Sequence, residues 1–192
     1  QPTQTSRSVI LSTEGNYRQV HSGDVKIYEN LSVLPHAFIV HQVEVVEDDE
    51  QAIAAMKNPR FDPRQKLVLL RSDDTAAGSI QTGHPSDQDE ATVLSYEPER
   101  IVIKANLESS GWLFLADTYY PGWQATVDDR PVEIFQANVL FRGVPVPAGE
   151  HVVEFEFTPR SFRWGVAVTG VTLLLTIAGL VAIATKWAVR RR

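Results

Sequence analysis

Polar and apolar residues alternate along the second half of the chain in the way that β-strands require. Near its end, Val153, Phe155 and Phe157 alternate with Glu154 and Glu156, which is typical of a strand with one buried face and one wet face. Six further segments of similar character precede it, separated by short turns. The seven predicted strands cover residues 92–96, 100–107, 112–117, 123–127, 132–135, 139–144 and 151–157. Strands at this spacing predict an antiparallel β-sandwich.

The first half begins with a predicted hairpin and a strongly apolar strand. Residues 17–20 and 25–28 flank a polar stretch in which Gly23 supplies the turn. Residues 37–46 (AFIVHQVEVV) are apolar and rich in β-branched side chains. That composition predicts a single strand buried on much of both faces.

One short helix is expected between two strands of this first half. Asp48 and Asp49 precede the stretch EQAIAAMKN, which carries an N-cap signal and ends at Asn58-Pro59. Residues 66–70 (KLVLL) predict another strand, and the polar residues 72–91 predict an exposed loop.

An uncharged run of 22 residues near the C-terminus predicts a membrane span. Residues 164–185 contain no charged side chain, and a helix of that length extends about 33 Å, close to the hydrocarbon thickness of a bilayer. Trp164 and Trp187 stand at its two ends, where interfacial aromatic residues belong. A buried core helix is the alternative, but such a helix carries a polar stripe that this run lacks.

The predicted fold class is therefore mainly β: an antiparallel β-sandwich with one short helix in its first half, followed by one C-terminal transmembrane helix. The expected domains are residues 1–162, extracytoplasmic and β-rich (1–91 mixed, 92–158 sandwich strands), 163–185, the transmembrane helix, and 186–192, a basic cytoplasmic tail. The chain opens on Gln1 in a polar stretch without a signal peptide. We therefore expect it to be the end of a longer chain that delivers the domain across the membrane.

The charges are unevenly distributed and indicate both the orientation and the class of partner. Of 18 basic residues, four follow residue 163, so residues 1–163 carry 14 basic and 24 acidic groups, a balance of −10. The basic residues after the span place the C-terminus in the cytoplasm and the main domain outside. So acidic a domain is a poor partner for nucleic acid. The chain has no cysteine, which excludes disulfides and thiol catalysis.

The densest group of chemically capable side chains lies in the segment DTYYPGW, residues 117–123. Aromatic rings can stack on the apolar face of a sugar, while a carboxylate accepts hydrogen bonds from its hydroxyls. The candidate glycan-binding residues are Trp112, Asp117, Tyr119, Tyr120 and Trp123. A structural interpretation stands beside this one: Pro121-Gly122 forms the middle of a type II turn, and the neighbouring rings fill the edge of the core.

Other motifs give no catalytic residue, metal site or cofactor. Asp128-Asp129 predicts a hairpin turn, where two carboxylates are too well solvated for acid–base catalysis. The five histidines lack metal-binding spacing, and neither a GxSxG motif nor a phosphate-binding glycine loop is present. Arg142, between Phe141 and Gly143, is a weak candidate for contact with a phosphate or an acidic neighbour.

The order of several motifs resembles the C-terminal region of the YfhO-like bacterial membrane proteins. The carriers are YYPGW, the turn that follows it, the segment ANVLFRGVPVPAGEH, the final FEFTP and the earlier VKIYENLSVLPHAFIV. The resemblance covers roughly residues 17–185. Asp129 replaces the usual turn glycine, and His36 replaces the usual arginine.

The resemblance implies a polytopic protein similar to the membrane glycosyltransferases that use polyprenyl-phosphate-linked sugars. In such proteins the catalytic carboxylate lies in an early extracytoplasmic loop, which this chain does not contain, so no catalytic residue is carried over. The expected partners are membrane lipid, glycan or polyprenyl-phosphate-linked sugar, and the other transmembrane helices of the parent protein. Two interpretations remain open: an accessory domain that contacts glycan or lipid-linked sugar, and a non-catalytic structural β-sandwich anchored to the membrane.

Overall fold

The computed structural model describes residues 16–71 and 83–190. The chain divides into two units, Gln1–Pro35 and His36–Arg192. The polar opening of the chain and much of the predicted loop 72–91 lie outside the described residues. The first unit holds the predicted hairpin, in which β1 (Tyr17–Ser22) pairs antiparallel with β2 (Lys26–Asn30). Nearly all of its side chains are exposed.

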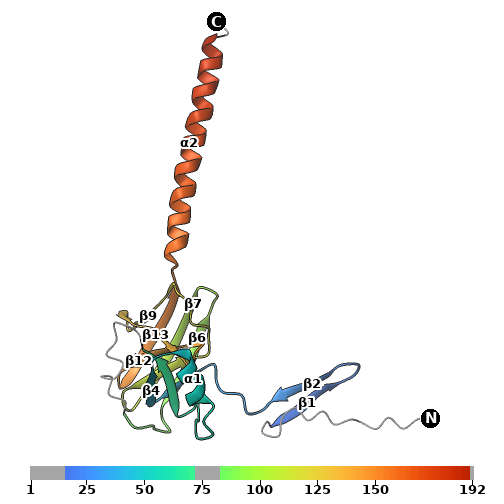
Figure 1. The fold of residues 1–192 in the computed structure, drawn as a ribbon, viewed down its shortest axis with the longest axis vertical. Coiled ribbons are helices and arrows are strands. Elements are labelled where there is room, and N and C mark those ends of the chain that lie inside the picture. Colours follow the sequence, from blue (N-terminus) through green and yellow to red (C-terminus); the bar gives the residue numbers. More distant parts are fainter. Residues whose placement is uncertain (1–15, 72–82, 191–192) are drawn as a thin grey trace, which may run out of the picture. The chain divides into compact units, whose positions relative to one another are not determined.

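The second unit is built on two larger sheets. One has five strands in the order β10-β9-β13-β7-β6, and the other has six in the order β3-β8-β12-β11-β5-β4. The strands of the five-stranded sheet are β6 (Glu90–Tyr96), β7 (Arg100–Leu107), β9 (Trp123–Val127), β10 (Arg130–Val132) and β13 (Gly149–Phe157). Those of the six-stranded sheet are β3 (Ala37–Val40), β4 (Gln42–Val46), β5 (Lys66–Leu70), β8 (Gly111–Leu115), β11 (Phe135–Ala137) and β12 (Phe141–Val146). The predicted mainly β class is confirmed (Figure 1).

Apolar side chains from both sheets meet in one core. The alternating pattern of β13 buries Val153 and Phe155, which pack with Ile101 and Ile103 of the same sheet and with Leu113 and Leu115 of the other. A second cluster lies on the opposite face of β8 and includes Trp112 and Phe114. Because successive side chains of β8 point to opposite faces, both of its faces are buried.

The predicted strand over residues 37–46 is wrong as a single element. It divides at His41 into β3 and β4, which are the two opposite edges of the six-stranded sheet. Since one residue joins them, Val40 and Gln42 lie within about 7 Å of each other. The sheet must therefore curl until its two edges meet at His41.

His41 is buried and fixes this bend through both ring nitrogens. Its Nδ1 lies 3.1 Å from the Ser110 carbonyl oxygen, and its Nε2 lies 2.8 Å from Asp89 Oδ2. Asp89 also accepts hydrogen bonds from the backbone N–H groups of Ser86 and Glu108. Both ring nitrogens face acceptors, so this arrangement is fully bonded when the imidazole carries two protons.

The predicted short helix is confirmed as α1 (Asp49–Met56). Asp48 is its N-cap, and its side chain accepts a hydrogen bond of 2.8 Å from the Gln51 N–H. The helix joins β4 to β5, which pair in parallel, so the sandwich is not wholly antiparallel. A helical crossover between neighbouring strands is the connection that parallel pairing needs.

The last element is α2 (Arg160–Arg190), which Figure 1 shows as one continuous helix. Its segment Trp164–Val181 has a mean hydropathy of 2.0, and none of these residues is buried. Its length and composition are those of a membrane span. Only Thr158 and Pro159 separate α2 from the end of β13.

Candidate functional site

Residues 116–122 cross from β8 in the six-stranded sheet to β9 in the five-stranded sheet. The predicted Pro121-Gly122 turn is present, and Gly122 has a φ of +112°. A Cβ atom at Gly122 would lie 2.9 Å from Phe157 Cε2 and 3.2 Å from Pro159 Cα. The Gly122 carbonyl oxygen also accepts a hydrogen bond of 2.8 Å from the Thr158 N–H. Only glycine fits this conformation and this close approach.

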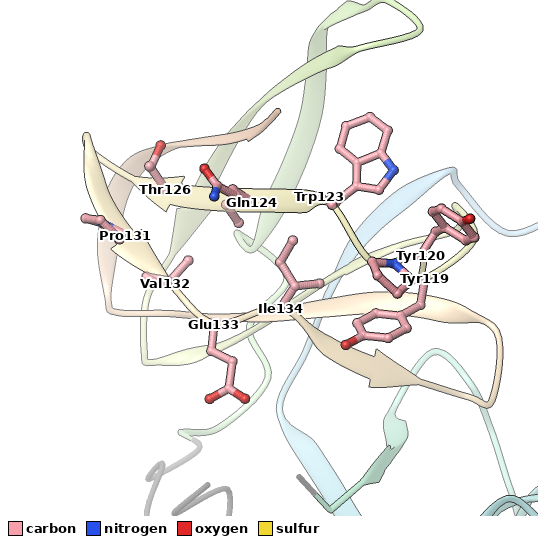
Figure 2. Close-up of a pocket in the computed structure, with 12 residues that line it drawn as sticks. Tyr119, Tyr120, Trp123, Gln124, Thr126, Pro131, Val132, Glu133 and Ile134 are labelled. Carbon is pink, nitrogen blue, oxygen red and sulfur yellow. The ribbon is translucent and has the colours of Figure 1, made fainter. Parts of the chain in front are cut away.

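An open groove of about 530 Å³ lies beside this crossing. Tyr119 and Tyr120 stand at one end of it, and Gln124 and Thr126 follow along β9 (Figure 2). Residues 131–134 form the other side, where Ile134 supplies apolar surface. Aromatic surface therefore meets polar side chains along one concave strip, as in many small-molecule sites.

The predicted aromatic residues have different exposures. Tyr120 is 61% exposed and Tyr119 is 38% exposed, while Trp123 is half-buried. These three residues line the groove.

Trp112 is the exception among the candidate stacking residues. It is fully buried in the second core cluster and meets the Phe135 ring edge-on at 5.0 Å between centroids. A ring without exposed surface cannot stack on a sugar, so Trp112 does not belong to the groove. Its side chain is a core element of β8.

Asp117 is occupied by neighbours and does not line the groove. The Tyr96 hydroxyl lies 3.0 Å and 3.2 Å from its two carboxylate oxygens, and His36 Nε2 lies 3.5 Å away. Burial and the hydrogen bond to Asp117 raise the pKa of Tyr96 above its usual value. Asp117 therefore ties β6 to the crossing.

Arg142 packs against Trp123 and so supports the groove from inside the domain. Its place in the sequence does not reveal this role. Its guanidinium carbon lies 3.9 Å from the centroid of the Trp123 ring, and its Nε donates a hydrogen bond of 3.0 Å to the Thr118 carbonyl oxygen. The residue is 4% exposed, and burial lowers the pKa of its guanidinium. Within the described part of the chain, its Nη1 has no hydrogen-bond partner. One face of Trp123 is thus covered by a cation.

A second hollow, of about 630 Å³, shares residues 120–124 with the groove. It extends to Phe157, Thr158, Pro159 and Ser161, where β13 passes into α2. The Phe157 ring lies 5.3 Å from Trp123 and 6.4 Å from Tyr120 between centroids.

The remaining chemically capable groups form local pairs. The predicted Asp128-Asp129 turn is present, with both residues at positive φ, as a two-residue type I′ hairpin requires. Asp128 accepts a hydrogen bond from the Val152 N–H and lies 2.6 Å from His151 Nδ1. Over residues 16–71 and 83–190, no group of three or more His, Cys, Asp or Glu side chains is placed to hold a metal ion.

Sequence reasoning missed His36, Tyr96, Phe157 and the supporting role of Arg142. Tyr96 and Asp117 come together across 21 residues, and Arg142 reaches Thr118 across 24. No local pattern encodes such contacts. For Trp112 a signal did exist, since the run GWLFL lacks the alternation of a half-exposed strand.

Residues 81–169 match the model of the bacterial membrane protein YfhO. Residues 81–169 are a YfhO-like region. The match runs from before β6 into α2, and it contains the groove, Arg142 and the Gly122 turn. No curated protein and no solved structure matches the chain. The YfhO match and the apolar helix α2 together support a membrane location.

Proposed function

We propose that the β-rich part of this chain is an extracytoplasmic accessory domain of a YfhO-like, glycosyltransferase-like membrane protein, and that it contacts glycan or lipid-linked sugar through the groove. α2 is its membrane anchor. The observation that carries the proposal is the placing of two adjacent exposed tyrosine rings beside polar side chains in one open groove. Such rings can stack on a sugar while the polar groups bond its hydroxyls.

The charge pattern supports the proposed orientation. Lys186 and three terminal arginines follow the apolar window, whereas Arg160 and Arg163 precede it. Basic residues collect on the cytoplasmic side of a span. The main domain then faces the exterior, where envelope glycans are found.

The test is glycan-array binding by the full chain in lipid nanodiscs. Tyr120→Ala should weaken binding about tenfold or more, which is about 1.4 kcal/mol, because it removes the most exposed ring of the groove. Tyr17→Ala is the matched control, since it removes a 39%-exposed tyrosine from β1. Equal loss in the two variants, or no binding by a folded parent, would overturn the proposal.

A second function, a structural sandwich without a ligand, is favoured by a different observation. Trp112 is buried, Asp117 is bonded to Tyr96, and one face of Trp123 is covered by Arg142. Three of the five candidate residues thus have structural partners. Absence of glycan binding by the folded chain would select this function.

A further inference from the structure

The hollow at the junction of β13 and α2 presents an aromatic surface. We call this surface the junction face; it consists of Tyr120, Trp123, Phe157 and Pro159. The lining residues that the structure describes carry no charge, although residues 1–163 together carry a charge of −10. An exposed aromatic patch on an acidic domain is typical of a surface that contacts another protein or a membrane.

The chain itself limits how far the junction face lies from the bilayer. Three backbone steps lead from Phe157 to Arg160, and four helical steps lead on to Trp164, where the apolar window begins. The whole path is at most about 17 Å. The headgroup layer on each side of the hydrocarbon is about 5–8 Å thick. Phe157 therefore lies within about 12 Å of the headgroups.

The junction face is tied to that short connection rather than tethered loosely. Thr158 donates a backbone hydrogen bond to Gly122, and Phe162 donates one of 3.1 Å to the Pro159 carbonyl oxygen. Gly122 approaches both Phe157 and Pro159 closely enough to exclude a Cβ atom. The residues that carry the rings thus move together with the residues that enter the membrane helix.

Its side chains are those that prefer the boundary between lipid and water. Tyrosine and tryptophan combine an apolar ring with a polar group and collect at the level of the headgroups. Tyr120 is 61% exposed, and two further aromatic residues near the start of α2, Phe162 and Trp164, are 70% and 72% exposed.

We propose that the junction face docks on the phospholipid headgroup layer of the membrane that α2 spans. The partner is the lipid surface itself, and the contact holds the β domain in a fixed orientation against the bilayer. This inference concerns the hollow beside Phe157, which shares Tyr120 and Trp123 with the groove, and it does not require that the groove bind a glycan.

The test uses the full chain in vesicles of phosphatidylethanolamine and phosphatidylglycerol. Since the chain has no cysteine, Tyr120→Cys gives a single site for an NBD fluorophore. Glu108→Cys is the matched control. Glu108 is exposed and directly follows Leu107. Leu107 pairs with Gly149, at the end of β13 that is farthest from α2. Lipids with a nitroxide on the headgroup should quench the label at residue 120 several-fold more than the label at residue 108.

The outcomes are distinct. Equal, weak quenching at the two sites would overturn the proposal. Protection of residue 120 from aqueous iodide without quenching by nitroxide lipid would mean that protein covers the face, and would overturn it too. A second label at Gln124→Cys, also beside the hollow, guards against misfolding of the first variant. Glycan binding is scored separately, so each proposal can fail alone.

Discussion

The Arg142 guanidinium carbon lies 3.9 Å from the centroid of the Trp123 ring, inside a domain where the arginine is 96% buried. The pair joins β12 to β9, and hence the six-stranded sheet to the five-stranded one. It also holds the tryptophan that both hollows share. The stack therefore fixes the base of the candidate site.

The first prediction separates the charge of Arg142 from its shape. Arg142→Met should change the free energy of unfolding by less than about 1 kcal/mol, because it removes a buried cation whose Nη1 has no hydrogen-bond partner among the described residues. Arg142→Lys should lower it by about 2–3 kcal/mol, because the ammonium keeps the burial cost without the planar stack. Urea unfolding of the two variants checks this. A less stable Met variant than Lys variant would contradict it.

Gly122 is predicted to tolerate no side chain. Gly122→Ala should lower the free energy of unfolding by about 1–3 kcal/mol, because its φ of +112° strains any L-residue and the new Cβ would meet Phe157. Thermal unfolding followed by tryptophan fluorescence measures the loss. Gly170→Ala is the control, since nothing lies within 4 Å of a Cβ built there, and it should leave the midpoint unchanged.

The buried pair of Asp89 and His41 should couple strongly. Asp89→Ala is expected to cost about 2–4 kcal/mol, because it leaves His41 and two backbone N–H groups without their acceptor. A double-mutant cycle with His41→Phe should give a coupling energy of about 1–3 kcal/mol. A coupling near zero would mean that the two residues act independently.

Acid should weaken the same pair. Burial raises the pKa of Asp89, but hydrogen bonds from Glu108, Ser86 and His41 outweigh it and hold that pKa below its usual 3.8. The stabilisation is therefore complete above about pH 4 and is lost as the pH falls through the lowered value. Asp89→Asn should flatten this acid limb of the stability–pH curve, measured by urea unfolding from pH 5 to pH 2.5.

The pair of His151 and Asp128 should weaken as the pH rises, not as it falls. Burial lowers the pKa of His151, but Asp128 and the Ala148 carbonyl outweigh it and hold that pKa above 6.5. Its stabilisation is therefore complete below pH 6.5 and is lost as the pH rises through the raised value. Asp128→Asn should reduce the fall in stability between pH 6 and pH 8.5.

The control for that experiment is Asp129→Asn, which makes the same change of charge in the same turn. If both variants reduce the fall equally, the effect comes from overall charge and not from the bond between His151 and Asp128.

Local patterns were sufficient for most of the strands, for α1 and for α2. The alternation of residues 151–157 and the N-cap at Asp48 are encoded by neighbours in sequence, so they could be read directly. The split at His41 could not, because β-branched residues stand on both sides of it and no Gly, Pro, Asn or Asp interrupts residues 37–46. What divides them is a sheet in which the two pieces are opposite edges, with β8, β12 and β11 from the second half of the chain between them.

The site was predictable only in part, for a related reason. The exposed Tyr119, Tyr120 and Trp123 come from one continuous segment, whereas their supports come from elsewhere: Arg142 from β12 and Phe157 from β13. Exposure itself depends on tertiary packing, and among the candidate rings only Trp112, in the unbroken apolar run GWLFL, has a sequence context that indicates burial.

The position of β13 has a mechanical consequence. It is the central strand of the five-stranded sheet, hydrogen-bonded to β7 over residues 149–156 and to β9 over residues 153–157, and it leads into α2 within two residues. A pull on the helix therefore reaches the sheet along its central strand. Ladder hydrogen bonds on both sides of β13 then share a load applied along the strand, whereas an edge strand would have a ladder on one side alone.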